Sequence, residues 1–303
     1  MRGNSLKDDF RALVANGNSL NQLIVVNIVV YIGLSLIAVI LALFKLQPGW
    51  YHIVSGYLAV PAYLPNLLFR PWSLLTYMFV HGGFFHILFN MLWLYWIGRI
   101  FQDFLGTKKL VALYFLGGFA GALMYIISFN FFPLFSTELA SAKAVGASAS
   151  VLAIVVGTAT LLPNYTLRLF LFGNVPLKYL ALFMIVIDLL SLAGNNAGGH
   201  FAHLGGAIFG FVYIKQLQGG RDLGAGFNRL ADALVTRFSR SSRLKVSYKR
   251  PNPQSASIKT QPTQTGGRVP QEVIDRILDK IAHHGYDGLS KEEKEQLFRA
   301  SKQ

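Results

Sequence analysis

The chain has 303 residues, of which 53% are hydrophobic and only 14% are charged, and its formal net charge is +14. Most of its 28 basic and 14 acidic residues lie from Lys215 onward, so the first 214 residues carry too few charges to cover a water-soluble domain. Cysteine is absent, which excludes a thiol nucleophile, a disulfide framework and a metal site with cysteine ligands. The positive charge does not by itself indicate nucleic acid, because basic segments beside membrane helices bind the anionic cytoplasmic leaflet.

Six apolar stretches follow one another along the chain. They are Leu23–Phe44, Leu74–Phe101, Leu110–Phe131, Ala147–Leu162, Leu177–Ala193 and His200–Ile214. A bilayer core of ~30 Å needs about 20 helical residues, and the first three stretches reach that length. The last three are shorter and contain polar residues. We expect an all-α, polytopic membrane helix bundle with six transmembrane helices, formed by residues 23–218.

The positions of lysine and arginine predict how these helices cross the membrane. Basic residues precede the first stretch, flank the second and fourth connections and fill the tail, as at Arg11, Arg99, Lys108 and Arg168. Both termini, including the N-terminal segment 1–22, are therefore expected to be cytoplasmic. The second, fourth and sixth helices then run from outside to inside, and their unusual polar residues all fall in the outer half of the membrane. These are His81, His86 and Asn90, then Ser148 and Ser150, then His200 and His203.

The fourth stretch has the polar start that most suggests chemistry. It spans ~24 Å at 1.5 Å per residue, less than the membrane core, so Ser148 near its start is expected to lie below the outer surface. A serine at this place ordinarily caps the helix. It also lies beside free backbone N–H groups that can stabilise an oxyanion, and it becomes nucleophilic if a base takes its proton.

Histidines on two other stretches offer the remaining groups of such a site. His203 is preferred to His200 as the base, because it lies three residues before Gly206, on the face that can approach another helix. His86 and Asn90 are four residues apart and share one helical face, so they are candidate oxyanion donors.

Two further polar residues have more than one interpretation. His81 is as suited to bonding a loop as to a direct role. Asp188 lies within a short apolar stretch, where an acid is a functional candidate. The preferred interpretation is that Asp188 is protonated or hydrogen-bonded between helices, and a third catalytic group is the alternative.

These residues together resemble the rhomboid family of intramembrane serine proteases over about residues 70–214. The resemblance rests on Gly146-Ala147-Ser148-Ala149, on Ala202-His203-Leu204-Gly205-Gly206 and on the order His81, His86, Asn90. It implies a Ser148–His203 dyad without a third acid, and an oxyanion site made by the Ser148 backbone N–H, His86 and Asn90. It also implies cleavage of single-span membrane-protein substrates near the outer surface of a bacterial inner membrane, with no metal or other cofactor.

The chain departs from the family at four positions, one of which is Ala149, where glycine is commoner after the nucleophile. Ser73 stands where the family often has arginine, Gln102 where many members have glutamate, and Leu152 where an aromatic residue is often found. None of these departures removes a catalytic group.

The tail divides into a basic segment with a flexible linker, residues 219–269, and a helical hairpin, residues 270–303. Apolar residues scattered between Lys215 and Arg250 predict an amphipathic helix on the lipid surface. In the hairpin, Gly285 is expected to end the first helix, and Ser290 with Glu293 predicts a capping box that begins the second.

Two rival functions use some of the same residues. The first is that of an intramembrane metalloenzyme or metal transporter. His81, His86, His200, His203 and Asp188 are potential metal ligands, but the chain has no H-E-x-x-H motif and few carboxylates to support zinc chemistry. The other rival is an inactive rhomboid-like protein that binds membrane clients. Such relatives typically lose the serine or the histidine, and this chain has both.

Overall fold

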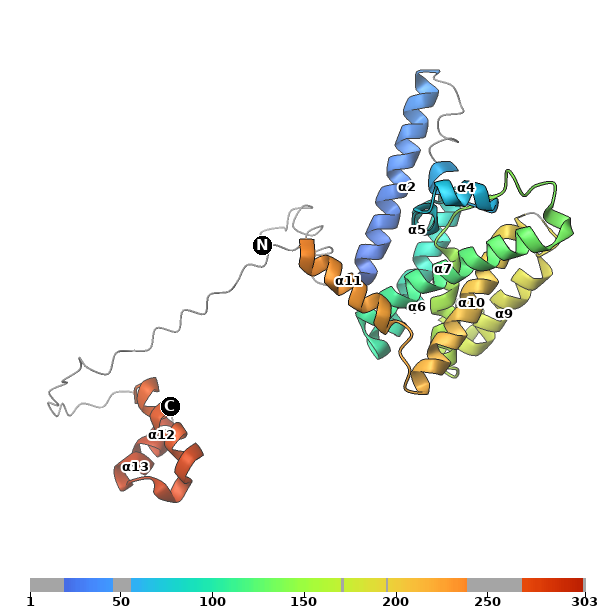
Figure 1. The fold of residues 1–303 in the computed structure, drawn as a ribbon. Coiled ribbons are helices and arrows are strands. Elements are labelled where there is room, and N and C mark those ends of the chain that lie inside the picture. The colour runs from blue at the N-terminus through green and yellow to red at the C-terminus, as the bar shows by residue number, and fades with distance from the viewer. Residues whose placement is uncertain (1–18, 46–55, 170–171, 195, 239–268, 302–303) are drawn as a thin grey trace. The chain divides into compact units, whose positions relative to one another are not determined.

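The computed structural model describes residues 19–45, 56–169, 172–194, 196–238 and 269–301. The chain divides into two compact units, Met1–Ser241 and Ser242–Gln303, each of which is described by itself. The first unit is a bundle of helices (Figure 1). Its helices are α2 (Ser19–Leu43), α4 (Leu64–Phe69), α5 (Ser73–Thr76), η1 (Tyr77–Phe79), α6 (Phe84–Leu105), α7 (Thr107–Phe131), η2 (Pro133–Phe135), α8 (Ser148–Leu161), α9 (Leu177–Leu190), α10 (Ala197–Gln218) and α11 (Ala225–Phe238).

The predicted class, a polytopic bundle of membrane helices, is confirmed. Helices α2, α6 and α7 are long and apolar enough to cross a membrane, and α8 is a shorter apolar helix. Large apolar side chains on the outside of these helices are exposed, as are Ile32 and Leu36 of α2. Such a surface suits contact with lipid. The count of six transmembrane helices stays a prediction.

The predicted second helix, Leu74–Phe101, is wrong in its first part. This stretch begins with α5 and the short 3₁₀ helix η1, and Val80 then adopts an extended conformation before α6 starts at Phe84. Gly82 and Gly83 favour this break, because glycine is a poor helix former. His81 therefore lies in the loop before α6, and His86 and Asn90 lie in the first two turns of that helix.

Small residues bring α7, α8 and α10 into backbone contact, as the sequence predicts. A methyl group added at Gly206 of α10 would overlap the carbonyl oxygen of Ala149 on α8, and one at Gly210 would overlap that of Ala153. One added at Gly121 of α7 would meet both the Ala149 side chain and the carbonyl of Ala202. The three helices therefore cross with almost no side chain between them, which places the start of α8 beside the residues around Ala202.

Two small antiparallel ladders fix the connections. Strand β1 (Val60–Pro61) pairs with β2 (Lys143–Ala144), so the segment that follows α2 is tied to the loop that leads into α8. Strands β3 (Thr166–Leu169) and β4 (Gly173–Pro176) join the end of α8 to α9. The first ladder ends two residues before Gly146, close to the predicted nucleophile.

Helix α11 belongs to the first unit and packs on α7. Phe227 stacks on Phe115, with their ring centroids 5.4 Å apart, and Lys108 forms an ion pair with Asp232 at 2.7 Å. The ion pair is largely exposed, so it contributes little stability. The apolar contact is therefore the main attachment of α11 to the bundle.

The second unit is the predicted helical hairpin. It comprises α12 (Gln271–His284), a 3₁₀ turn η3 (Tyr286–Gly288) and α13 (Lys291–Ala300). Gly285 ends α12 with φ of 74°, a conformation that favours glycine. Ser290 and Glu293 form the predicted capping box. The Ser290 backbone N–H first, and the Lys280 ammonium next, hold the pKa of Glu293 below its usual range.

Removing the Ser290 side chain tests this capping box. We expect Ser290→Ala to weaken α13 by about 1 kcal/mol, because the backbone N–H of Glu293 loses its acceptor. Hydrogen exchange of the full chain should then be about fivefold faster at the first amides of α13. Ser301→Ala is the matched control, because its hydroxyl bonds a carbonyl at the other end of the same helix. Equal exchange in the two variants would contradict the prediction.

Candidate active site

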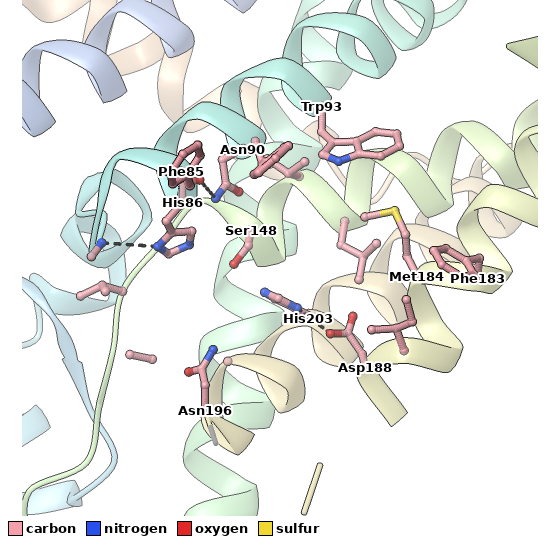
Figure 2. A pocket seen from close by; sticks show the side chains of 18 of the residues that line it. Phe85, His86, Asn90, Trp93, Ser148, Phe183, Met184, Asp188, Asn196 and His203 are labelled. Atoms are coloured by element: carbon pink, nitrogen blue, oxygen red, sulfur yellow. Dashed lines mark hydrogen bonds and ion pairs between the residues drawn. The ribbon is translucent and has the colours of Figure 1, made fainter. Parts of the chain in front are cut away.

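A cavity of about 790 Å³ lies among α6, α8, α9 and α10. Figure 2 shows Ser148, His203, His86 and Asn90 around it, with Asp188 behind His203. All four predicted site residues therefore line one cavity. The rest of the wall is mostly apolar and includes Phe85, Phe89, Trp93, Val151, Leu152, Leu180, Phe183, Met184 and Ile187.

Ser148 is the first residue of α8, where the helix has free backbone N–H groups. Gly146, two residues earlier, has φ of 129°, which residues with a side chain rarely adopt. Its backbone N–H donates to the carbonyl of Tyr77 at 2.9 Å. A Cβ added there would lie 2.8 Å from two ring atoms of His86 and 3.4 Å from the hydroxyl oxygen of Ser148. The absence of a side chain at Gly146 lets the His86 ring and the Ser148 hydroxyl share one corner of the cavity.

The contact at Nδ1 of His86 favours the tautomer that an oxyanion donor needs. Its Nδ1 accepts a long hydrogen bond, 3.4 Å, from the backbone N–H of Gly82. A neutral imidazole that accepts at Nδ1 carries its proton on Nε2. Nε2 is one of the two ring atoms beside Gly146, so its N–H points to the corner where Ser148 lies.

Asn90 lies one turn further along α6 and is nearly buried. Its Nδ2 donates to the carbonyl of His86 at 2.8 Å. An amide nitrogen has two hydrogens, so one N–H is left for a group bound in the cavity.

His81 bonds a loop. Its Nε2 accepts from the backbone N–H of Ala147 at 3.5 Å, and its ring lies edge-on to that of His86, with centroids 5.1 Å apart. Of the two roles left open by the sequence, the structure has the one in which His81 supports the start of α8.

His203 faces Ser148 across the cavity. Figure 2 shows the Ser148 hydroxyl and one edge of the His203 ring pointing toward each other. The opposite ring nitrogen, Nδ1, lies 2.8 Å from Oδ1 of Asp188. Within the described residues no hydrogen bond joins Ser148 to His203, and catalytic hydrogen bonds are often long before substrate binds. The arrangement offers a hydroxyl, a base and two oxyanion donors around one point.

Asp188 bridges α9 and α10, as the preferred interpretation of the sequence predicts. Its Oδ1 lies 2.7 Å from Nδ1 of His200 as well as 2.8 Å from Nδ1 of His203. The sequence does not show that one carboxylate oxygen contacts both histidine rings. The spacing of His200 and His203 on one helical face was the signal available, and only the crossing of α9 and α10 brings Asp188 to it.

The same three residues form a group with the composition of a metal site, since their ligand atoms all lie within 4.8 Å of one another. Two ligands of a tetrahedral zinc ion at ~2.05 Å are about 3.3 Å apart. The observed separations of 2.7 and 2.8 Å are those of charge-assisted hydrogen bonds. The arrangement in this structure therefore favours hydrogen bonding over metal ligation.

Comparison with known proteins gives matches over both units. Residues 69–218 match the family model described as the Rhomboid domain, and residues 268–303 match a family of unknown function, DUF6576. RHOMBOID-like protein 12, mitochondrial, of Arabidopsis thaliana is 31% identical over 161 residues, which are 50% of this chain and 48% of that protein. RHOMBOID-like protein 1 of the same plant is 33% identical over 154 residues, 49% of this chain and 36% of that protein.

A bacterial relative matches a shorter segment. Rhomboid protease GlpG of Salmonella paratyphi A is 35% identical over 86 residues, 28% of this chain and 26% of that protein. The chain thus spans about half or less of the length of these relatives. The segment that matches the Rhomboid domain runs from the end of α4 through α10 and contains Ser148, His203, His86 and Asn90. The chain belongs, through this domain, to the rhomboid family.

Proposed function

We propose that this protein is an intramembrane serine endopeptidase that cleaves membrane-spanning segments of other proteins. Ser148 is the nucleophile and His203 is the base. The observation that carries the proposal is the hydroxyl of Ser148, which starts a helix and points at the His203 ring inside an apolar-walled cavity. Membership of the rhomboid family supports the same reaction.

In the first step, His203 takes the proton of the Ser148 hydroxyl as its oxygen attacks a peptide carbonyl carbon of the substrate. The carbonyl oxygen becomes an oxyanion. The backbone N–H of Ser148, Nε2–H of His86 and the free N–H of Asn90 are its donors. His203 then gives the proton to the leaving amine. Water attacks the resulting acyl-enzyme in the second half of the reaction and restores the Ser148 hydroxyl.

The substrate class follows from the walls of the cavity. Phe89, Trp93, Phe183 and Met184 line the same cavity as Ser148, so an apolar peptide segment replaces water there at little cost. The peptide must also be extended at the cut, because a helical carbonyl is hydrogen-bonded within its own chain and shielded by side chains. Single-span membrane proteins with a locally unwound segment near the outer surface meet both requirements.

The positions of the basic residues support a cell-membrane location with both termini cytoplasmic. Helix α11 supports contact with lipid. It exposes Leu230, Leu234 and Val235 together with two arginines, Arg229 and Arg237. An amphipathic basic helix of this kind binds anionic lipid surfaces.

Active-site labelling tests the proposal directly. We expect a fluorophosphonate probe to label the full chain in membranes, and mass spectrometry of the labelled peptide to place the adduct on Ser148. The same preparation should cleave a single-span reporter protein. Metal chelators are expected to leave both the labelling and the cleavage unchanged, because no step uses a metal ion. An adduct on Ser150 instead, or cleavage that chelators alone abolish, would overturn the assignment.

A further inference from the structure

We propose that Asp188 is a positioning residue for the catalytic base: it holds the His203 ring so that the unprotonated nitrogen faces Ser148. This inference rests on the proposed function. It departs from the two-residue arrangement that the family resemblance implies, because it adds a carboxylate that acts through His203.

The contacts of Asp188 determine where the His200 and His203 rings carry their protons. An ionised carboxylate only accepts hydrogen bonds, and a neutral imidazole has a single N–H. Asp188 Oδ1 contacts Nδ1 of His203 at 2.8 Å and Nδ1 of His200 at 2.7 Å. With Asp188 ionised and both rings neutral, these contacts require that each ring carries its proton on Nδ1. Nε2 of His203 is then left with a lone pair, and that edge of the ring faces Ser148 in Figure 2. A base needs this tautomer to take the serine proton.

The His203 ring has few polar contacts that could hold its orientation. Among the described residues, the bond to Asp188 is the hydrogen bond recorded for the His203 side chain. Its aromatic neighbour is the His200 ring, edge-on at 5.8 Å. Leu152 lies beside the same cavity but offers no polar group. Rotation of the ring about its last side-chain bond would turn Nε2 away from Ser148, and the Asp188 contact opposes it.

The carboxylate of Asp188 is buried. The Asp188 side chain is only 8% exposed, and a carboxylate removed from water needs donors to offset its lost hydration. Its two N–H donors come from His200 and His203. When His203 accepts the serine proton, a positive charge forms 2.8 Å from this carboxylate in a largely apolar site, where the attraction is stronger than in water. Asp188 itself takes no proton, and the proton passes from Ser148 through His203 to the leaving amine.

His200 has a distinct part in this arrangement. It donates to the oxygen of Asp188 that also meets His203, so it anchors the carboxylate rather than the base. Loss of His200 leaves the Asp188–His203 contact in place. His200→Ala therefore tests the anchoring of the carboxylate separately from its loss, and a smaller effect than that of Asp188→Asn is expected.

The test is Asp188→Asn in the full chain, assayed with the membrane reporter. Asparagine has the size of aspartate but offers an N–H that can donate to Nδ1 of His203. The ring proton then moves to Nε2, and Nε2 can no longer accept the proton of Ser148. We expect kcat to fall at least about 10²-fold, KM to stay within about threefold, and fluorophosphonate labelling to slow in parallel. A residue with a merely structural role would instead lower the melting temperature and the yield of folded protein. We expect Asp188→Glu to recover at least tenfold in kcat over Asp188→Asn, because it keeps the carboxylate, and His200→Ala to stay within about tenfold of the wild type.

Rates are taken per folded molecule, from the monodisperse fraction, so that a folding defect does not imitate a catalytic one. If Asp188→Asn does not fold, Asp188→Ala takes its place. This variant also lacks the carboxylate, so kcat should fall at least about 10²-fold with KM little changed, and an unchanged kcat overturns the inference. Full kcat in Asp188→Asn beside an inactive Ser148→Ala likewise overturns the role of Asp188 and leaves the proposed function standing. Cleavage by Ser148→Ala removes the proposed function itself.

Discussion

Ser148→Ala is expected to abolish reporter cleavage and fluorophosphonate labelling together. Without the hydroxyl no acyl-enzyme forms, and the remaining groups only polarise the substrate carbonyl. Losing one member of a serine–histidine unit costs on the order of 10⁴-fold or more in kcat. The fold should not change, because Ser148 has no hydrogen bond that caps α8. The melting temperature is therefore expected to stay close to that of the wild type.

Ser150→Ala is the matched control for this change. Ser150 lies one residue beyond Ala149 on the same helix. Its hydroxyl is buried with no hydrogen-bond partner in the described part of the chain, and Ser150 does not line the cavity. Substantial activity is expected to remain in this variant. His203→Ala should match Ser148→Ala in its loss, since the serine then has no base. Measurable cleavage by Ser148→Ala in purified form would refute the mechanism.

Gly206→Ala is expected to lower both the stability and the activity of the protein. The added methyl group would overlap the carbonyl oxygen of Ala149, which is backbone and cannot rotate aside. Helices α8 and α10 must then separate at the level of Ser148 and His203. Overpacking of this kind costs about 1–3 kcal/mol, and a displacement of about 1 Å between nucleophile and base costs about 10²-fold in rate. Both the melting temperature and kcat should fall.

Gly33→Ala separates this effect from the general consequence of replacing a glycine in a helix. Gly33 lies within α2, and nothing stands within 4 Å of the position that its Cβ would take. The substitution is expected to leave activity unchanged and to keep or slightly raise stability, because alanine is the better helix former. Equal losses in the two variants would show that close contact of α8 with α10 is not what matters.

The sequence predicts the helices well where apolar length alone defines them. The predicted stretches Leu110–Phe131 and Leu177–Ala193 differ from α7 and α9 by three residues at one end. The predicted helix Leu74–Phe101 failed because hydropathy over a long window does not register a break of four residues between apolar neighbours. Gly82 and Gly83 were the local sign of that break.

The sequence predicted which residues line the candidate site, but it did not predict the hydrogen bonds between them. Ser148, His203, His86 and Asn90 come together as expected, while their catalytic roles stay predictions until the variants are assayed. The bond from Asp188 to both histidines depends on how α9 crosses α10, and no periodicity in either segment encodes that crossing. The ladder between β1 and β2 is two residues long, too short to leave a pattern.

Helix α10 has two faces with different roles: one contacts α8, and the other is exposed on the outside of the bundle. Where backbone touches backbone, the spacing between Ser148 and His203 is set by the thickness of the main chain, not by the rotamer of any side chain. The opposite face of α10 exposes Ile208 and Val212. Substitutions at those positions can therefore adapt the lipid-facing surface to bilayers of different thickness without changing the contact that sets the positions of Ser148 and His203.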